Sequence, residues 1–173
     1  MSKEEMQKDI ITIFSEGVRT HRKGDLPIIN NTNGKDCFIL DIPEEIESKF
    51  RKNFQIDEKE VIMMARDTSP WNTRKEGLVI TDRRIVYIPG KTDFSCSKCI
   101  VELNSFSKVT YDAKALLFWG TEKTFFPIPA SFFFKSKMKS YDVDRATKNL
   151  GKLLSKIAKS IGARKRTHPA AIA

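Results

Sequence analysis

The chain of 173 residues lacks the long apolar run that a membrane-spanning helix requires. No uninterrupted apolar stretch approaches the roughly 20 residues that cross a bilayer. The charged start, MSKEEMQKDI, also lacks the apolar centre of a secretory signal, so we expect a cytoplasmic protein. A hydrophobic content of 40% with 12 phenylalanines argues against disorder, and the length fits one compact domain with appended elements.

Cysteine is scarce as well. Three cysteines are too few for a disulfide scaffold, and they agree with a reducing compartment. Cys96 and Cys99 have the spacing of a metal half-site or a redox pair, but a structural zinc site needs four ligands, and only Cys37 and His21 remain as contributors. The alternative is a hairpin loop with one cysteine turned inward. We therefore expect no metal and no other cofactor.

No recognisable catalytic motif is present. Neither His21 nor His168, the only histidines, is framed as a triad base or as one of a pair of metal ligands, and there is no GxSxG, HExxH or paired-carboxylate motif. Gly90-Lys91-Thr92 resembles the end of a phosphate-binding loop, but that motif needs a glycine five positions earlier, where Ile85 stands. The sequence therefore favours a protein that is not an enzyme and has no small-molecule substrate, with a cysteine- or zinc-dependent enzyme as the least favoured alternative.

The hydrophobic pattern predicts helices near both ends of the chain and strands between them. Residues 2 to 18 read as an amphipathic helix whose Ser2 and Glu5 have capping-box spacing, residues 21 to 36 as a linker, CFIL as a short strand, and residues 42 to 54 as a second helix. From Glu60 to about Phe133, seven apolar runs follow at regular spacing: VIMMA, GLVIT, RIVYI, CIVEL, KVTY, ALLFW and TFFPI. Such runs predict an antiparallel sandwich or small barrel.

The last predicted element is an amphipathic helix over residues 146 to 161. It follows a turn-like segment, residues 139 to 144, and its apolar side chains recur at helical spacing with lysines on the opposite face. Gly162 is expected to end the helix, and the residues beyond it to form a frayed tail.

Positive charge is concentrated at this end of the chain. Residues 1 to 134 carry 20 basic and 20 acidic residues, whereas residues 135 to 166 carry 11 basic and 2 acidic ones, which accounts for the net charge of +9. A stripe of one sign attracts anionic membranes or nucleic acids, although the lysines could also be simply solvated while the apolar face caps the barrel. The candidate anion- or partner-binding residues are Lys148, Lys152, Lys156, Lys159, Arg164, Lys165 and Arg166.

The stretch GLVITDRRIVYIPG, residues 77 to 90, contains a charged break between two apolar runs. If Asp82 and Arg83 are the central residues of a tight hairpin, the break is a corner. The pairs that this register predicts are Ile80 with Ile85, Leu78 with Tyr87 and Val79 with Val86. Apolar pairs on both faces predict a sheet that is also covered on its outer side, for which the N-terminal helix is the candidate.

One family resemblance follows from these segments. The order of DEKEVIMMARDTSPW, EGLVITDRRIVYIPG, IVELNSFSKVTYDAKALLFWG and a closing amphipathic helix resembles the bacterial pleckstrin-homology-like (PH-like) domains, in which an acidic "dEk" segment precedes a "GlvlTdrRiyy" hairpin. The resemblance covers residues 56 to 161. It implies an α+β fold, with a bent antiparallel barrel or sandwich of about seven strands capped by the C-terminal helix, and a role in binding or assembly. Residues 1–55 would then be a helical extension and linker packed on the barrel, 56–162 the PH-like domain, and 163–173 a flexible basic tail.

Aromatic residues are expected mainly in the barrel core or under its cap, Trp71 and Trp119 among them. Phe132, Phe133 and Phe134 are consecutive and cannot all face inward on one strand, so at least one is expected at a neighbour, a subunit interface or a groove. The leading hypothesis is a binding module whose partner is a protein or its own copy, aided by an anionic surface. The alternative is a nucleic-acid-associated protein that uses the basic helix and tail.

Overall fold

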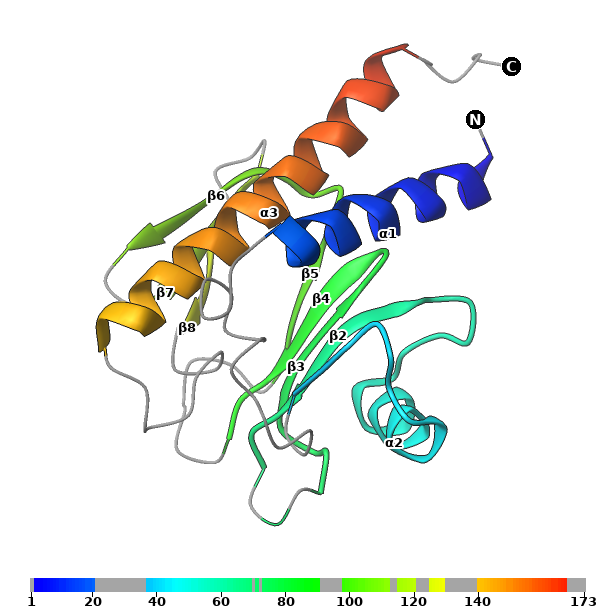
Figure 1. The fold of residues 1–173 in the computed structure, drawn as a ribbon, viewed down its shortest axis with the longest axis vertical. Helices are drawn as coiled ribbons and strands as arrows, with labels where there is room; N and C mark the ends of the chain where they lie inside the picture. Colours follow the sequence, from blue (N-terminus) through cyan, green and yellow to red (C-terminus); the bar gives the residue numbers. More distant parts are fainter. Residues whose placement is uncertain are drawn as a thin grey trace.

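The computed structural model describes residues 2–20, 37–69, 71, 73–90, 98–112, 115–120, 125–129 and 140–167. In these residues three helices and eight strands form an α+β fold with two antiparallel sheets (Figure 1). The helices are α1 (Lys3–Thr20), α2 (Glu44–Phe54) and α3 (Ser140–Thr167). The strands are β1 (Cys37–Ile39), β2 (Ile62–Asp67), β3 (Gly77–Thr81), β4 (Arg84–Ile88), β5 (Cys99–Glu102), β6 (Phe106–Asp112), β7 (Ala115–Gly120) and β8 (Phe125–Pro129).

The strands follow chain order within each sheet. The first sheet has the order β1-β2-β3-β4-β5 and the second β6-β7-β8. Each strand corresponds to a predicted apolar run, with CFIL giving β1 and the seven later runs giving β2 to β8. Among the described strands no ladder joins the two sheets, so their hydrogen bonding does not close a barrel.

The β3–β4 hairpin has the predicted register. Ile80 lies opposite Ile85, Leu78 opposite Tyr87 and Val79 opposite Val86. The charged break at Asp82 and Arg83 is therefore the corner that joins the two strands. The pairing of apolar side chains across the two adjacent strands was sufficient to predict this register.

Both faces of the first sheet are covered, but by different helices than the pattern suggested. The face with Leu78 and Ile80 packs in one core cluster with the buried side chains of α1 and α3. The opposite face, with Val79 and Val86, packs in a second cluster with Phe50 and Phe54 of α2. The prediction that the N-terminal helix covers the outer face was therefore wrong, and α2 has this role because its aromatic pair fills that side.

Helices α1 and α3 lie side by side over the first core cluster (Figure 1). The predicted capping box of α1 is present, since the Ser2 amide donates to Glu5 Oε2 at 2.7 Å and the Glu5 amide donates to Ser2 Oγ at 3.2 Å. Gly17 permits a close approach, because a Cβ there would collide with the side chain of Leu153 on α3. The two helices therefore form one layer.

Helix α3 is longer than predicted. It begins at Ser140 and not at residue 146, and it continues through Gly162 to Thr167. A glycine inside a helix costs only about 1 kcal/mol relative to alanine, and the basic residues that follow are good helix formers and favour the helix C-terminus. Gly162 therefore does not end the helix, and residues 163–167, predicted as tail, are helical. The predicted linker, residues 21–36, lies outside the described residues.

Within the part of the chain that the structure describes, none of the helices has both the length and the apolar character needed to cross a bilayer.

Candidate functional site

The outward face of α3, defined by Lys148, Lys152, Lys156 and Lys159, is the most strongly charged surface that the sequence predicts, and we call it the lysine stripe. All four side chains are exposed. The opposite face of the helix is buried in the first core cluster through Leu150, Leu153, Leu154, Ile157, Ala158 and Ile161. Because this apolar face is already occupied, α3 offers basic side chains to a partner and not an apolar seam.

Specific contacts fix α3 on the second sheet. The Val109 amide donates to Ser155 Oγ at 2.8 Å, and this hydroxyl donates to the Val109 carbonyl at 3.3 Å. One member of the stripe, Lys148, holds its Nζ 5.8 Å from the centre of the Tyr111 ring, a cation–π contact. The helix that bears the lysine stripe is therefore held on the second sheet by these contacts.

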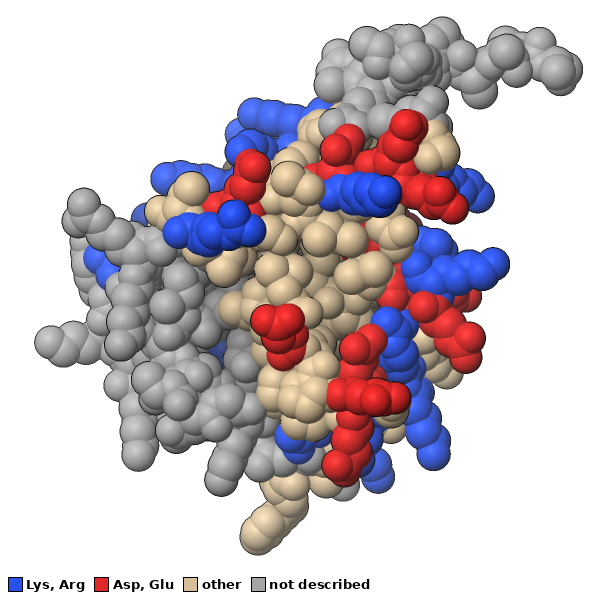
Figure 2. All heavy atoms as spheres, turned by 45° about the vertical axis from the view of Figure 1, so that its right-hand side comes forward, with Lys and Arg blue, Asp and Glu red and all other residues tan. Residues whose placement is uncertain are grey.

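The face of the molecule with α1 and α2 carries charges of both signs among its described residues (Figure 2). On the side of the molecule that Figure 2 turns forward, which carries α1 and α2, Lys and Arg side chains alternate with Asp and Glu around an uncharged central area. On α2, for example, Lys49 pairs with Glu45 and Arg51 with Glu47. A soluble surface usually intersperses charges in this way. The lysine stripe differs because residues 148 to 166 include no acidic residue.

Several predicted site residues lie outside what the structure describes. The backbone at Arg164, Lys165 and Arg166 belongs to α3, but their side chains are not described. Phe132, Phe133 and Phe134, the candidate apolar contacts, and Cys96 also lie outside the described residues. The predicted site is therefore described structurally only in the four residues of the lysine stripe.

Cys99 is disulfide-bonded, so its sulfur is not free to bind a metal. This differs from the expectation of reduced cysteines, which rested on the number of cysteines alone. Among the described residues no three His, Cys, Asp or Glu side chains gather as a metal site would require.

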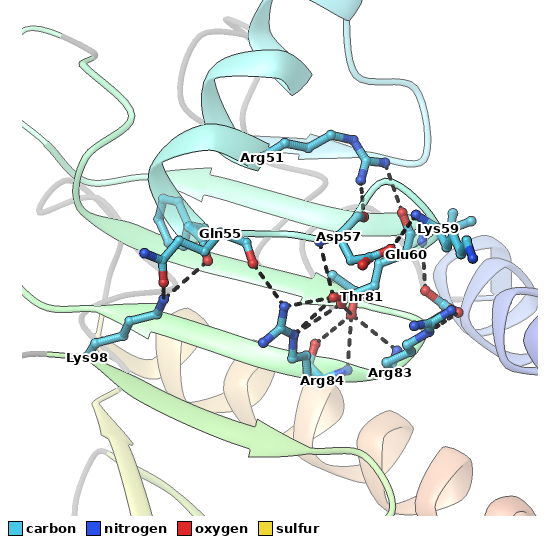
Figure 3. Close-up of polar contacts among 12 residues, drawn as sticks. Arg51, Gln55, Asp57, Lys59, Glu60, Thr81, Arg83, Arg84 and Lys98 are labelled. Atoms are coloured by element: carbon cyan, nitrogen blue, oxygen red, sulfur yellow. Dashed lines mark hydrogen bonds and ion pairs between the residues drawn. The ribbon is translucent and has the colours of Figure 1, made fainter.

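The charged corner of the β3–β4 hairpin is a buried polar network (Figure 3). Arg84 donates to Glu60 from Nη2 at 2.7 Å and from Nε at 3.1 Å, and Thr81 Oγ1 donates to the same carboxylate at 2.8 Å. Arg84 Nη2 also donates to the carbonyl of Gln55, the left-handed residue that caps α2. This network ties α2 to the hairpin.

The electrostatics of the corner follow from burial and pairing. Burial by itself raises the pKa of the Glu60 carboxyl, but hydrogen bonds from Arg84 and Thr81 and the charge of Arg84 outweigh it and hold the pKa below its ordinary value. Burial instead raises the pKa of Asp82, although the Val61 amide donates to its Oδ1 at 2.7 Å. The side chains of Thr81, Asp82 and Arg84 thus stabilise the corner, which is a structural role.

The loop between β2 and β3 is held from two sides. Asp67, whose side chain is fully buried, accepts from the Ser69 amide at 2.9 Å and from the Ser69 hydroxyl, and it forms an ion pair with Arg74 at 3.3 Å. From α2, Asn53 Nδ2 donates to the carbonyls of Thr73 and Arg74 at 3.3 and 2.9 Å. These contacts fix the backbone on both sides of Trp71.

Trp71 itself projects from this loop into solvent. Its side chain is 94% exposed, and its φ of 65° is in the left-handed region, which a bulky residue rarely adopts. The expectation that Trp71 lies in the core was therefore wrong. Trp119 is also 40% exposed, with its Nε1 donating to Thr110 Oγ1 at 2.7 Å. The neighbouring Ser, Pro and Asn residues are a turn signal that could have placed Trp71 on a loop.

A pocket of about 560 Å³ lies between α1 and the hairpin corner. Met6 and Ile10 supply its apolar lining. The polar lining residues are Lys3, Glu4, Gln7, Lys59, Asp82 and Arg83. Buried Asp82 lies at its wall, where Arg83 Nε is 3.9 Å from Oδ2. Because the Asp82 carboxylate already accepts a hydrogen bond from the Val61 amide, the pocket offers a ligand mainly apolar surface, with three cations and the Glu4 carboxylate around it. Sequence reasoning missed this pocket because α1 and the corner are far apart in the chain.

No protein-family model, curated protein or solved structure matches this chain. The PH-like resemblance of residues 56 to 161 accordingly stays a prediction. What the chain binds must be inferred from its own surfaces.

Proposed function

We propose that this chain is a non-catalytic PH-like module that binds a protein partner or further copies of itself, and that the lysine stripe adds contact with an anionic surface. The observation that carries the proposal is the division of α3. Its apolar face is buried against the sheets and α1, while Lys148, Lys152, Lys156 and Lys159 face outward. A rigid helix with cations alone on its outer face favours peripheral, salt-sensitive binding.

The polar clusters support a binding role over a catalytic one. Glu60, Asp67 and Asp82 are buried, and each is engaged in hydrogen bonds that hold loops or strands together. The order of the strands, with a following helix packed on the second sheet, supports the PH-like architecture. In such a fold the function lies in the exposed surfaces.

Nucleic acid is the second candidate partner, and the same segregation of charge favours it. Backbone phosphates bind a basic stripe through counterion release without sequence readout. The lysine stripe on the outward face of α3 includes no aromatic residue. Stacking of nucleic-acid bases on aromatic side chains would therefore contribute little there. Binding to nucleic acid by this face would therefore be non-specific.

Co-sedimentation with phosphatidylserine-containing vesicles and binding to duplex DNA, each at low and physiological salt, test the proposal. We expect the wild type to bind the vesicles. Changing Lys148, Lys152, Lys156 and Lys159 together to glutamine should weaken vesicle binding by about a hundredfold or more, because each lysine near an anionic surface contributes about fivefold.

A matched variant changes four exposed lysines on other elements, Lys8, Lys49, Lys52 and Lys75, to glutamine. It removes the same total charge, yet it should bind almost as well as the wild type, because these lysines are distributed over α1, α2 and the β2–β3 loop and form no stripe. If vesicle binding were weakened equally in both variants, only the net charge would matter, and the lysine stripe would not be the binding surface. Preference for DNA over vesicles at physiological salt would favour the second candidate.

A further inference from the structure

The exposed Trp71 and the pocket under α1 lie at opposite ends of the first sheet. The loop that bears Trp71 follows the end of β2, whereas Lys59 of the pocket precedes the start of β2, and Asp82 and Arg83 follow the end of β3. Figure 1 shows the β2–β3 connection at the lower end of the sheet and α1 at its upper end. Strands of this length span about 20 Å, so Trp71 cannot enter the pocket of its own chain.

The loop holds Trp71 ready for contact. A non-glycine residue in the left-handed region costs free energy, and a fully exposed indole forgoes the stabilisation that burial would provide. The buried Asp67 and the Asn53 side chain hold the backbone at Ser69 before Trp71 and at Thr73 and Arg74 after it. Tryptophan is enriched among the anchor residues of protein interfaces, because it buries a large area while only two side-chain torsions become ordered.

The pocket has the chemistry that an indole requires. Its volume of about 560 Å³ admits a tryptophan side chain, and Met6 and Ile10 provide apolar and thioether contacts. Lys3, Lys59 and Arg83 place cations around it, and cations bind the face of an indole more strongly than that of any other side chain. The pocket is therefore large enough for the indole of Trp71, and it offers apolar side chains for the ring and cations for its face.

We propose that Trp71 of one copy docks into the pocket under α1 of a second copy, so that molecules associate head to tail. The proposal rests on, and deepens, the assembly part of the proposed function. The contact joins two different surfaces, so it repeats from copy to copy and forms rings or open chains. We favour a second copy over a lipid surface as the partner of this loop, because the chain itself carries a pocket with an apolar lining and cations that would accept an indole.

Sedimentation velocity of the full chain over a concentration series tests the association. We expect reversible oligomers that grow with concentration, and a Trp71→Ala variant with association at least about thirtyfold weaker, the threshold for an anchor residue. A double variant, Lys59→Glu with Arg83→Glu, should lose association to a similar extent. Both changes fall on exposed side chains, and circular dichroism checks that the fold is retained.

Mixing the two variants tests directly whether Trp71 of one copy binds the pocket of another. Trp71→Ala retains the pocket, and the double variant retains Trp71, so an equimolar mixture should form dimers that grow no further. In a Trp119→Phe background Trp71 is the only tryptophan, and its fluorescence emission should shift to the blue as the dimer forms.

A wild type that stays monomeric to millimolar concentration, or a mixture without dimers, would overturn the proposal. Loss of phosphatidylserine vesicle binding in Trp71→Ala, with a monomeric wild type, would instead identify Trp71 as a membrane anchor and would also overturn it. These results are independent of the lysine-stripe variants, so failure of head-to-tail docking is distinguishable from failure of anionic-surface binding.

Discussion

Replacing Glu60 with glutamine should lower the free energy of unfolding by about 3 kcal/mol at neutral pH, because it leaves the Arg84 guanidinium partly buried without its charged partner. The carboxylate is only 3% exposed and is the shared acceptor for Arg84 and Thr81. Urea denaturation followed by circular dichroism measures the difference. The matched control is Glu58→Gln, which removes an exposed carboxylate two residues away and should change stability by less than about 0.5 kcal/mol.

The same variant has a predicted pH dependence. Because the pKa of Glu60 is lowered in the folded protein, its stabilising effect is present above the ordinary value near 4.5 and is lost as pH falls through the folded pKa. The gap in stability between the wild type and Glu60→Gln should therefore narrow as the pH falls below the ordinary value of 4.5 and on through the lower pKa of the folded protein. A gap that stays constant down to pH 3 would mean that the ion pair is not the source of the loss.

Replacing Gly77 with alanine should cost about 3 kcal/mol or more. Gly77 has φ of 138°, which is strained for any residue with a Cβ, and a Cβ there would collide with the Arg66 carbonyl and lie 3.2 Å from the Thr68 amide. Neither neighbour is a flexible side chain, so the backbone of β2 would have to move. Thermal and urea denaturation measure the loss.

The matched control is Gly162→Ala, in α3. A Cβ at Gly162 meets nothing within 4 Å, so this change should stabilise the protein by up to about 1 kcal/mol through helix propensity. The two glycine-to-alanine changes should shift the free energy of unfolding in opposite directions, because a Cβ at Gly77 meets backbone whereas a Cβ at Gly162 meets open space. A Gly77→Ala protein as stable as the wild type would contradict the conformation of the β2–β3 connection.

The strands and the hairpin register could be predicted from the sequence because both depend on local pattern. Apolar pairs such as Val79 with Val86 fix the register through side chains that are close in the chain. The helix that covers this face could not be predicted in the same way. Phe50 and Phe54 of α2 pack on this face with two buried rings. Because α1 and α2 are both amphipathic, the sequence pattern alone does not decide which of them makes this tertiary contact.

The lysine stripe could be predicted from the sequence, whereas the full length of α3 and the exposure of Trp71 could not. The lysine stripe is a one-helix pattern, so periodicity alone identified it, whereas the extent of α3 depended on how much a glycine weakens a helix in context. Trp71 was assigned to the core because tryptophan is buried on average. Its exposure results from contacts of Asp67 and Asn53, and the second of these comes from a different element.

Chemical labelling of lysines in the wild-type protein, with and without phosphatidylserine-containing vesicles, tests the central claim most directly. The degree of acylation is measured at each lysine by mass spectrometry at low and physiological salt. We predict that vesicles protect Lys148, Lys152, Lys156 and Lys159 and leave Lys8, Lys49, Lys52 and Lys75 as reactive as before. Equal protection of both sets, or protection of neither, would contradict a binding surface on the outward face of α3.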